Sequence, residues 1–115
     1  MSITHTNVTI MVRDMDRSVT FYQSIGFTLA NRWGNHYAQL QAPGITLGIH
    51  PASGEILHGS GNVSIGFTSD DFEQATTLLK ELSIPADPRE EEGGRFLHFT
   101  DPDGTQLYFI KPKWN

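Results

Sequence analysis

Apolar and polar residues alternate in two short segments of the chain, and apolar residues at helical spacing follow each of them. Residues 7–12 (Asn-Val-Thr-Ile-Met-Val) and residues 62–67 (Asn-Val-Ser-Ile-Gly-Phe) show the period of two that is typical of a half-buried strand. Because the same kind of segment occurs twice and is followed twice by the same pattern, the sequence predicts an internal repeat.

An acidic turn precedes each predicted helix. Asp14 precedes the first helix and either Asp70 or Asp71 the second, at the N-cap position where a carboxylate accepts hydrogen bonds from unpaired backbone N–H groups. The first helix is predicted to end at Gly26 and the second before Pro85. The apolar residues that we expect these helices to bury are Val19, Phe21, Tyr22 and Ile25 in the first, and Phe72, Ala75, Leu78, Leu79 and Leu82 in the second.

Three further strands are predicted after each helix, with turn residues between them. The turn signals are Gly-Asn and Pro-Gly dipeptides in the first half, and Gly-Gly and Asp-Pro-Asp-Gly in the second. The predicted strands are Thr28–Trp33, His36–Gln41 and Ile45–His50 in the first half, and Ala86–Arg89, Arg95–Thr100 and Thr105–Lys111 in the second.

Each half is therefore predicted to be a β-α-β-β-β module, and neither module can bury its sheet alone. We predict a single α+β domain over residues 1–115, with βαβββ modules at about 5–51 and 62–112 and a connector at 52–61. The expected architecture is two facing curved mixed sheets with the helices outside. The alternative is a ferredoxin-like or other α+β domain whose halves are similar by accident.

The composition of the chain limits the classes of partner that it is expected to bind. The chain has 115 residues, 37% hydrophobic and 18% charged, which is typical of one soluble globular domain. No apolar run is long enough for a membrane span and the polar start has no signal-peptide pattern, so we expect a cytoplasmic protein without a membrane partner. There is no cysteine, which excludes disulfides and thiolate chemistry. A net charge of −5 argues against nucleic acid and mildly favours neutral or cationic ligands.

Two stretches resemble the opening and the closing of vicinal oxygen chelate domains, the superfamily of glyoxalases, bleomycin-resistance proteins and extradiol dioxygenases. They are residues 13–22 (Arg-Asp-Met-Asp-Arg-Ser-Val-Thr-Phe-Tyr) with the following Ile25-Gly26-Phe27, and residues 99–107 (Phe-Thr-Asp-Pro-Asp-Gly-Thr-Gln-Leu). The resemblance extends over about residues 5–112. It implies a small-molecule site in the curved sheets and, at this chain length, a homodimer.

The resemblance also places metal ligands on the first and last strand of each half. By motif, those four places fall on Asn7, Gly48, Ser64 and Tyr108, which provide neither a carboxylate nor an imidazole. We therefore expect no metal cofactor. A shifted register would bring His5 and His50 to the same face, but displaced in opposite directions and roughly 13 Å apart at about 3.3 Å per residue, too far for one metal ion.

Several other side chains are candidates for ligand contact. His50 ends a strand beside Pro51, and alternation places His98 on the opposite face from Leu97 and Phe99. Trp33 and Trp114 can stack on a planar ligand, although either can equally cover a core edge or a dimer seam. The complete set of predicted ligand-binding residues is Asn7, Thr9, Trp33, His50, Ser64, His98 and Tyr108.

Other polar features have simpler explanations. His5 and His58 are expected to be exposed to solvent, and His36 is either exposed in its turn or functional. The acidic run at residues 90–92 is interpreted as a solvated loop, or else as an acidic rim for a cationic antibiotic. No nucleophile elbow, catalytic triad signature or P-loop is present, so no catalytic residue is assigned.

The preferred hypothesis is a metal-free protein that binds a small molecule and sequesters an aromatic or cationic compound such as an antibiotic. The alternative is a metal-dependent lyase or dioxygenase of the same superfamily with shifted ligands. A third possibility is a degenerate homologue that acts through protein interaction.

Overall fold

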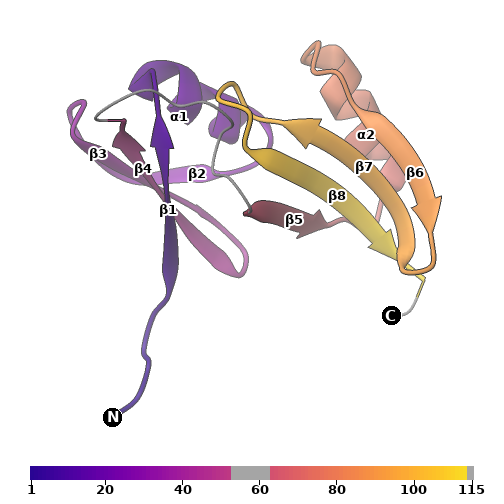
Figure 1. Cartoon of the computed structure of the whole chain (residues 1–115), viewed down its shortest axis with the longest axis horizontal. Coiled ribbons are helices and arrows are strands. Elements are labelled where there is room, and N and C mark those ends of the chain that lie inside the picture. The colour runs from indigo at the N-terminus through magenta and orange to yellow at the C-terminus, as the bar shows by residue number, and fades with distance from the viewer. Residues whose placement is uncertain (53–62, 114–115) are drawn as a thin grey trace. The chain divides into compact units, whose positions relative to one another are not determined.

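The computed structural model describes residues 1–52 and 63–113, and the chain divides into two compact units, residues 1–59 and 60–115. The first unit contains β1 (Asn7–Val12), α1 (Met15–Ser24), β2 (Thr28–Trp33), β3 (Tyr37–Ala42) and β4 (Ile45–Pro51) (Figure 1). The second contains β5 (Ser64–Thr68), α2 (Phe72–Glu81), β6 (Asp87–Glu91), β7 (Gly94–Thr100) and β8 (Gln106–Pro112). The predicted α+β fold of two βαβββ modules is confirmed.

Three sequence predictions concern residues that the structure does not describe. The proposed connector at 52–61 lies outside the described residues except for Ala52, and so do His58 and Trp114. That the two modules form one domain stays a prediction.

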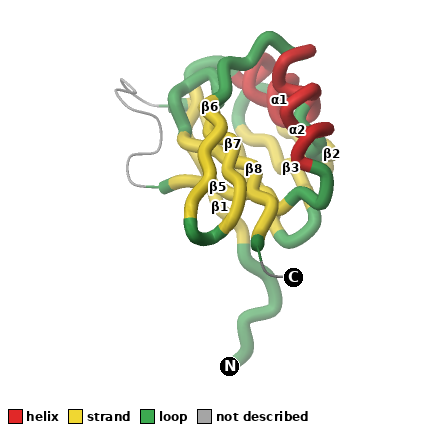
Figure 2. Tube along the Cα trace, turned by 90° about the vertical axis from the view of Figure 1, so that its right-hand side faces the viewer, coloured by secondary structure: helices red, strands yellow, loops and turns green. Residues whose placement is uncertain are grey.

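Each unit is built on a four-stranded mixed sheet. The strand order is β1-β4-β3-β2 in the first sheet and β5-β8-β7-β6 in the second. The first and last strands of each module pair in parallel, and the remaining pairs are antiparallel. Figure 2 shows β7 and β8 of the second unit side by side, with β6 at the edge of its sheet.

One face of each sheet packs on the helix of its own unit, because most of the apolar residues in the alternating pattern point to that side. α1 contacts β2, β3 and β4, and α2 contacts β8. The buried strand residues on these faces are Ile10, Val12, Ala38, Leu40, Leu47 and Ile49 in the first unit and Ile65, Leu97, Phe99 and Leu107 in the second. We call the other side of each sheet its helix-free face.

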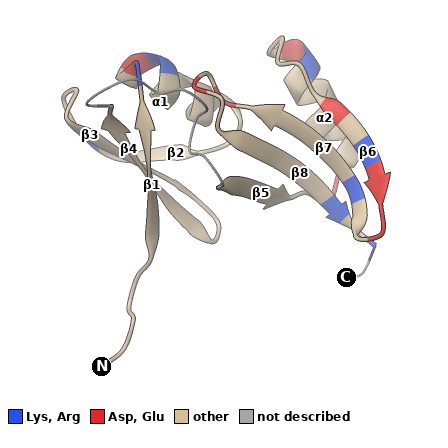
Figure 3. Ribbon diagram, in the orientation of Figure 1, with Lys and Arg blue, Asp and Glu red and all other residues tan. Residues whose placement is uncertain are grey.

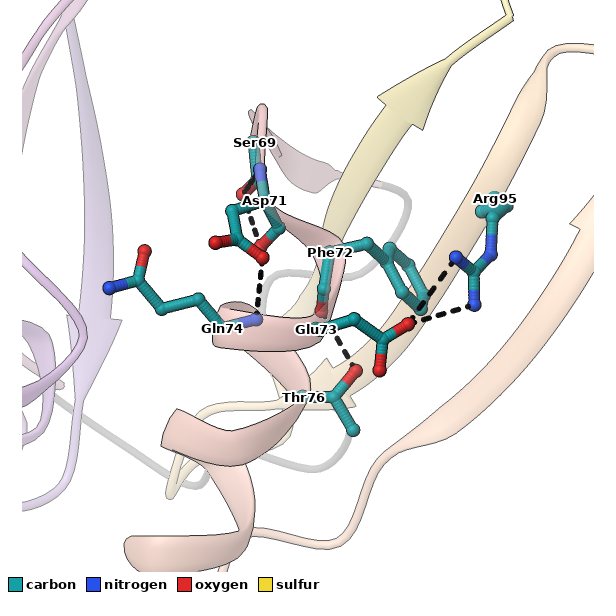
Figure 4. Close-up of polar contacts among 7 residues, drawn as sticks. All are labelled: Ser69, Asp71, Phe72, Glu73, Gln74, Thr76 and Arg95. Atoms are coloured by element: carbon teal, nitrogen blue, oxygen red, sulfur yellow. Dashed lines mark hydrogen bonds and ion pairs between the residues drawn. The ribbon is translucent and has the colours of Figure 1, made fainter.

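The N-caps of the two helices are confirmed. The Asp14 carboxylate accepts a hydrogen bond from the Arg17 N–H at 3.1 Å, and Asp71, rather than Asp70, accepts one from the Gln74 N–H at 3.0 Å (Figure 4). Among the described residues no helix is long and apolar enough to cross a membrane.

Most of the predicted helical core is buried, with one exception. Val19, Tyr22, Ile25, Phe72, Ala75 and Leu79 are buried, and Phe21 and Leu78 are half-buried. The prediction for Leu82 is wrong: its exposed fraction is 36%. The reason is that α2 ends at Glu81, so Leu82 is the C-cap residue and lies beyond the last helical turn that faces the sheet.

The bounds of six strands, β3 to β8, differ from the predicted ones by one or two residues, and two of these differences change the interpretation. β3 begins at Tyr37 rather than at His36, because residues 34–36 form the turn and Gly34 there has a φ of +56°. β6 extends to Glu91, so Glu90 and Glu91 belong to an exposed edge strand and not to a loop. Charged residues on an edge strand discourage pairing with another chain.

An arginine on a strand ties the first turn of each helix to its sheet. In the first unit, Arg32 on β2 forms an ion pair of 2.7 Å with Asp16 on α1. In the second, Arg95 on β7 lies 3.5 Å from the Glu73 carboxylate, and its guanidinium is 4.2 Å from the centre of the Phe72 ring (Figure 4). These contacts leave the helix-free faces to other side chains.

Candidate ligand-binding faces

The helix-free face of the first unit is lined mainly by neutral polar residues. The register places Thr9 of β1, Gly48 of β4 and Gln39 of β3 in one row across the sheet. Asn7 lies one row away, level with Thr46 and Gln41, while Met11 and His50 are level in the opposite direction. Asn7 and Thr9 are exposed.

An aromatic pair lies on this face and was only half predicted. Trp33 of β2 stacks on Tyr37 of β3 with ring centres 5.8 Å apart and an interplanar angle of 28°. The Tyr37 hydroxyl reaches the Thr9 hydroxyl at 3.4 Å, which brings it across β4. Sequence reasoning missed Tyr37, although its alternation with the buried Ala38 and Leu40 is a signal that it lies on the helix-free face.

His50 is exposed and lies near the end of β4, one residue beyond the Ala38–Ile49 pair and so level with Tyr37 in the register. Its Nδ1 is 2.7 Å from the carbonyl oxygen of Pro51. Because a carbonyl oxygen only accepts, Nδ1 carries the hydrogen in this contact, and in the neutral ring Nε2 remains an acceptor. His50 can therefore offer a hydrogen bond acceptor at the rim of the face.

A groove opens beside this face where β1 begins and β3 turns into β4. Its volume is about 390 Å³, and it is lined by His5, Thr6, Gln41, Ala42, Gly44, Ile45 and Thr46. The lining contains no acidic side chain among these residues, so a neutral polar ligand group fits it better than a metal ion.

The helix-free face of the second unit carries an aromatic cluster at its centre. The register places Gly66 of β5, Tyr108 of β8 and His98 of β7 in one row, with Phe96 beside them. The Phe96 and His98 rings are stacked at 5.8 Å with an interplanar angle of 12°, and each is 5.7 Å from the Tyr108 ring. The three residues are half-buried.

The structure thus brings together two of the predicted ligand-binding residues in this unit, His98 and Tyr108. Leu97 and Phe99 are buried on the helix side, as the alternation predicted. Ser64 is exposed on the same face as Tyr108 but lies opposite Gln106, two residues along β5 from Gly66.

An ion pair borders the aromatic cluster on β6. Arg89 contacts the Asp87 carboxylate through Nη2 at 2.8 Å and through Nε at 2.9 Å. Asp87 is level with His98, and Arg89 is level with Phe96. Both charged side chains are more than half exposed, so the pair stabilises the fold little, but it places both signs of charge beside the rings.

The positions at which the family resemblance places metal ligands do not fit a metal ion. Gly48 has no side chain, and Thr9 rather than Asn7 lies opposite it; Gly66 rather than Ser64 lies opposite Tyr108. Asn7 and Ser64 thus each lie two residues from the row of Gly48 or Tyr108. Within residues 1–52 and 63–113, no three His, Cys, Asp or Glu side chains gather closely enough to hold a metal.

The corrected register also separates the two histidines that a shifted site would need. Met11 is level with His50, and His5 precedes Met11 by six residues. At about 3.3 Å per residue this offset is roughly 20 Å, larger than the 13 Å expected from the sequence. One metal ion cannot bridge them.

A sequence model of the Glyoxalase/Bleomycin resistance protein/Dioxygenase superfamily matches residues 2–109. The chain belongs to this superfamily. The predicted resemblance is thereby confirmed.

Superfamily relatives include both enzymes and binding proteins. The chain is 24% identical to the metallothiol transferase FosB of Lysinibacillus sphaericus over 85% of this chain and 74% of that protein. Among solved structures it is similar to TnmS3, an antibiotic binding protein from a Streptomyces species, with 25% identity, a TM-score of 0.76, and coverage of 98% and 99% of the two chains. A bleomycin-binding protein complexed with bleomycin gives 24% identity, a TM-score of 0.74, and coverage of 96% and 100%.

Because this fold carries different functions, function has to be argued from the helix-free faces.

Proposed function

We propose that this protein binds a small aromatic or cationic compound, such as an antibiotic, without a metal and sequesters it in the cytoplasm as a homodimer. The observation that carries the proposal is the aromatic cluster of Phe96, His98 and Tyr108 at a place where the superfamily's enzymes have a metal ligand. A tyrosine ring at that position favours stacking over coordination.

The proposed contacts follow from the chemistry of each side chain. The rings of Trp33, His98 and Tyr108 stack on a planar ligand, while Asn7, Thr9 and Ser64 offer neutral hydrogen-bonding groups and His50 an exposed acceptor. Asp87 and the acidic end of β6 attract a cationic substituent of the ligand. Binding by these groups makes and breaks no covalent bond, so no residue is assigned a catalytic role.

Two of the similar structures support sequestration. One is an antibiotic binding protein and the other contains bleomycin. The likeness to FosB favours the second candidate, a metal-dependent enzyme of the lyase, dioxygenase or transferase kind. That candidate requires a ligand set other than the one the superfamily positions provide. The homodimer is carried over from the resemblance, and light scattering after size exclusion tests it.

Thermal unfolding with and without a chelator separates the two candidates. We expect bleomycin or another aromatic antibiotic to raise the melting temperature equally in the presence of EDTA. A ligand at a hundredfold excess over its Kd adds about 2.7 kcal/mol to the stability of the folded state. Calorimetry measures the Kd of the ligand. Tyr108→Ala should raise this Kd, whereas Lys111→Ala, at an exposed position on the same strand, should leave it unchanged.

The opposite result is equally clear. If Ni²⁺, Zn²⁺, Mn²⁺ or Fe²⁺ binds at one equivalent per chain and aromatic compounds bind only with that metal, the protein is a metal-dependent member of the superfamily. If neither metals nor a broad panel of aromatic antibiotics bind, sequestration is excluded as the function for that panel.

A further inference from the structure

Each helix-free face holds one tyrosine over one glycine of a neighbouring strand. A methyl group built on Gly66 would overlap Cζ, Cε2 and the hydroxyl of Tyr108. A methyl group on Gly48 would overlap the Tyr37 hydroxyl and lie 2.6 Å from the Thr9 hydroxyl and 2.9 Å from Tyr37 Cζ. We call each of these glycine–tyrosine pairs a ring seat.

The ring seats require the tyrosines to lean across the sheet. A strand side chain ordinarily stands roughly perpendicular to the sheet. Tyr108 instead extends from β8 over Gly66 on β5, and Tyr37 extends from β3 over Gly48 on β4 as far as Thr9 on β1. The rings are therefore held low, against the backbone.

Backbone conformation does not explain these two glycines. Among the described residues, the glycines with positive φ are Gly26, Gly34, Gly44, Gly94 and Gly104, all outside the ring seats. Glycine inside a strand weakens the strand, and it is found where another group approaches the backbone closely. At Gly48 and Gly66 that group is a tyrosine ring.

A low ring changes what the face can accept. A tyrosine that stands off the sheet fills the space above it, whereas a ring that lies on a glycine leaves that space open and presents its face. The Tyr108 ring adjoins the Phe96 and His98 rings, whose planes are tilted from it by 48° and 40°. A flat ligand stacked on Tyr108 would therefore meet these two rings at its edge, and a ligand of more than one fused ring is wide enough to reach them.

We propose that Gly66 is a specificity-determining positioning residue: it touches no ligand, and by seating Tyr108 it selects a planar, multi-ring aromatic compound. The inference rests on the proposed function, since it names the ligand class of the same face. Gly48 performs the same task for Tyr37 on the other sheet.

The test has two arms, and the first needs no ligand. In the NMR spectrum of the whole chain, the Gly66 Hα resonances should be displaced upfield by the Tyr108 ring current, and Tyr108→Leu should remove that displacement. Thr68→Ala, on the same strand and face, should leave it unchanged. Gly66 Hα resonances that do not respond to Tyr108→Leu overturn the ring seat and the proposal with it.

The second arm is a double-mutant cycle on affinity, with bleomycin and a fused-ring aromatic antibiotic as probes. Gly66→Ala should lower the affinity for the fused-ring probe about tenfold in the wild-type background. In the Tyr108→Leu background the same substitution should lower that affinity by less than about twofold. Equal losses in both backgrounds overturn the positioning role. If the ring-current arm succeeds but the wild-type chain binds neither probe, the proposed function fails, and the specificity role fails with it while the seat geometry stands.

Discussion

The two units share a topology and differ in the chemistry of their helix-free faces. In β1 to β4 the single charged residue is Arg32, and the face carries Thr, Asn and Gln side chains with one stacked Trp33–Tyr37 pair. In the second unit three rings occupy the centre of the face, and charged residues line β6 (Figure 3). The buried helix faces are alike, so a repeated module can keep its core while its other face changes function.

The largest expected difference from wild type comes from the shared core. Tyr22 of α1 and Leu79 of α2 occupy equivalent helix positions and are 0% and 1% exposed. Tyr22 also makes edge contacts with the Phe21 and Phe27 rings at 5.2 and 5.4 Å. Tyr22→Ala should lower the free energy of unfolding by about 3–5 kcal/mol and Leu79→Ala by about 2–5 kcal/mol.

Urea denaturation measures both losses, with the exposed Thr20→Ala as a control that should stay within about 0.5 kcal/mol of wild type. A loss below about 1 kcal/mol for either core variant would contradict the equivalence of the two cores.

The next largest effect is on ligand affinity, and it shows which of the two helix-free faces contributes more to binding. Tyr108 contacts two other rings, whereas Tyr37 contacts one. Tyr108→Ala should weaken an aromatic antibiotic about thirtyfold, on the order of 2 kcal/mol, and Tyr37→Ala about fivefold, on the order of 1 kcal/mol. Calorimetry measures both affinities. A larger loss of affinity for Tyr37→Ala than for Tyr108→Ala would show that the face of the first unit dominates binding.

A smaller effect should be equal in the two units. Asp14 and Asp71 cap equivalent helices with hydrogen bonds of 3.1 and 3.0 Å. Replacing either with alanine should cost about 1 kcal/mol of stability, because each leaves a helical N–H without its acceptor. Asp70→Ala, one residue before the second cap, is the matched control. If Asp70→Ala cost as much as Asp71→Ala, the effect would come from charge and not from capping.

The smallest effect is expected at the ion pair on β6. Arg89→Ala should change stability by less than about 1 kcal/mol, because both partners are more than half exposed. What remains of that change should shrink as salt is raised from low concentration to about 1 M. A loss of several kcal/mol in thermal or urea unfolding would show that the edge charges are part of the fold and not only of the face.

Periodicity in the sequence predicts the elements and the faces of this protein well. The alternation around His98 assigned its face, and the acidic turns located the helix starts. The sequence does not predict that Thr9 is level with Gly48, because the register of two parallel strands that are distant in sequence depends on tertiary packing, and local pattern carries no information about it. The prediction that Leu82 is buried was wrong for a local reason, since the helical spacing of apolar residues continues in the sequence beyond the last residue of α2.

Tyr37 shows where local reasoning ends at the site. Its strand and its face follow from alternation with Ala38 and Leu40, but its direction does not. That the ring extends over Gly48 to reach Thr9 depends on contacts among three strands, and only the folded sheet brings these together.

The two ring seats do not occupy equivalent positions in the two modules. When the two modules are aligned on their equivalent turn glycines, Gly44 and Gly104, Gly48 corresponds to Tyr108. The strand registers then make Thr9 correspond to Gly66, and Tyr37 to Phe96. The two seats therefore use non-equivalent positions of the repeat. The repeated topology alone does not produce a ring seat, because each seat depends on its own glycine and tyrosine and on a different pair of strands.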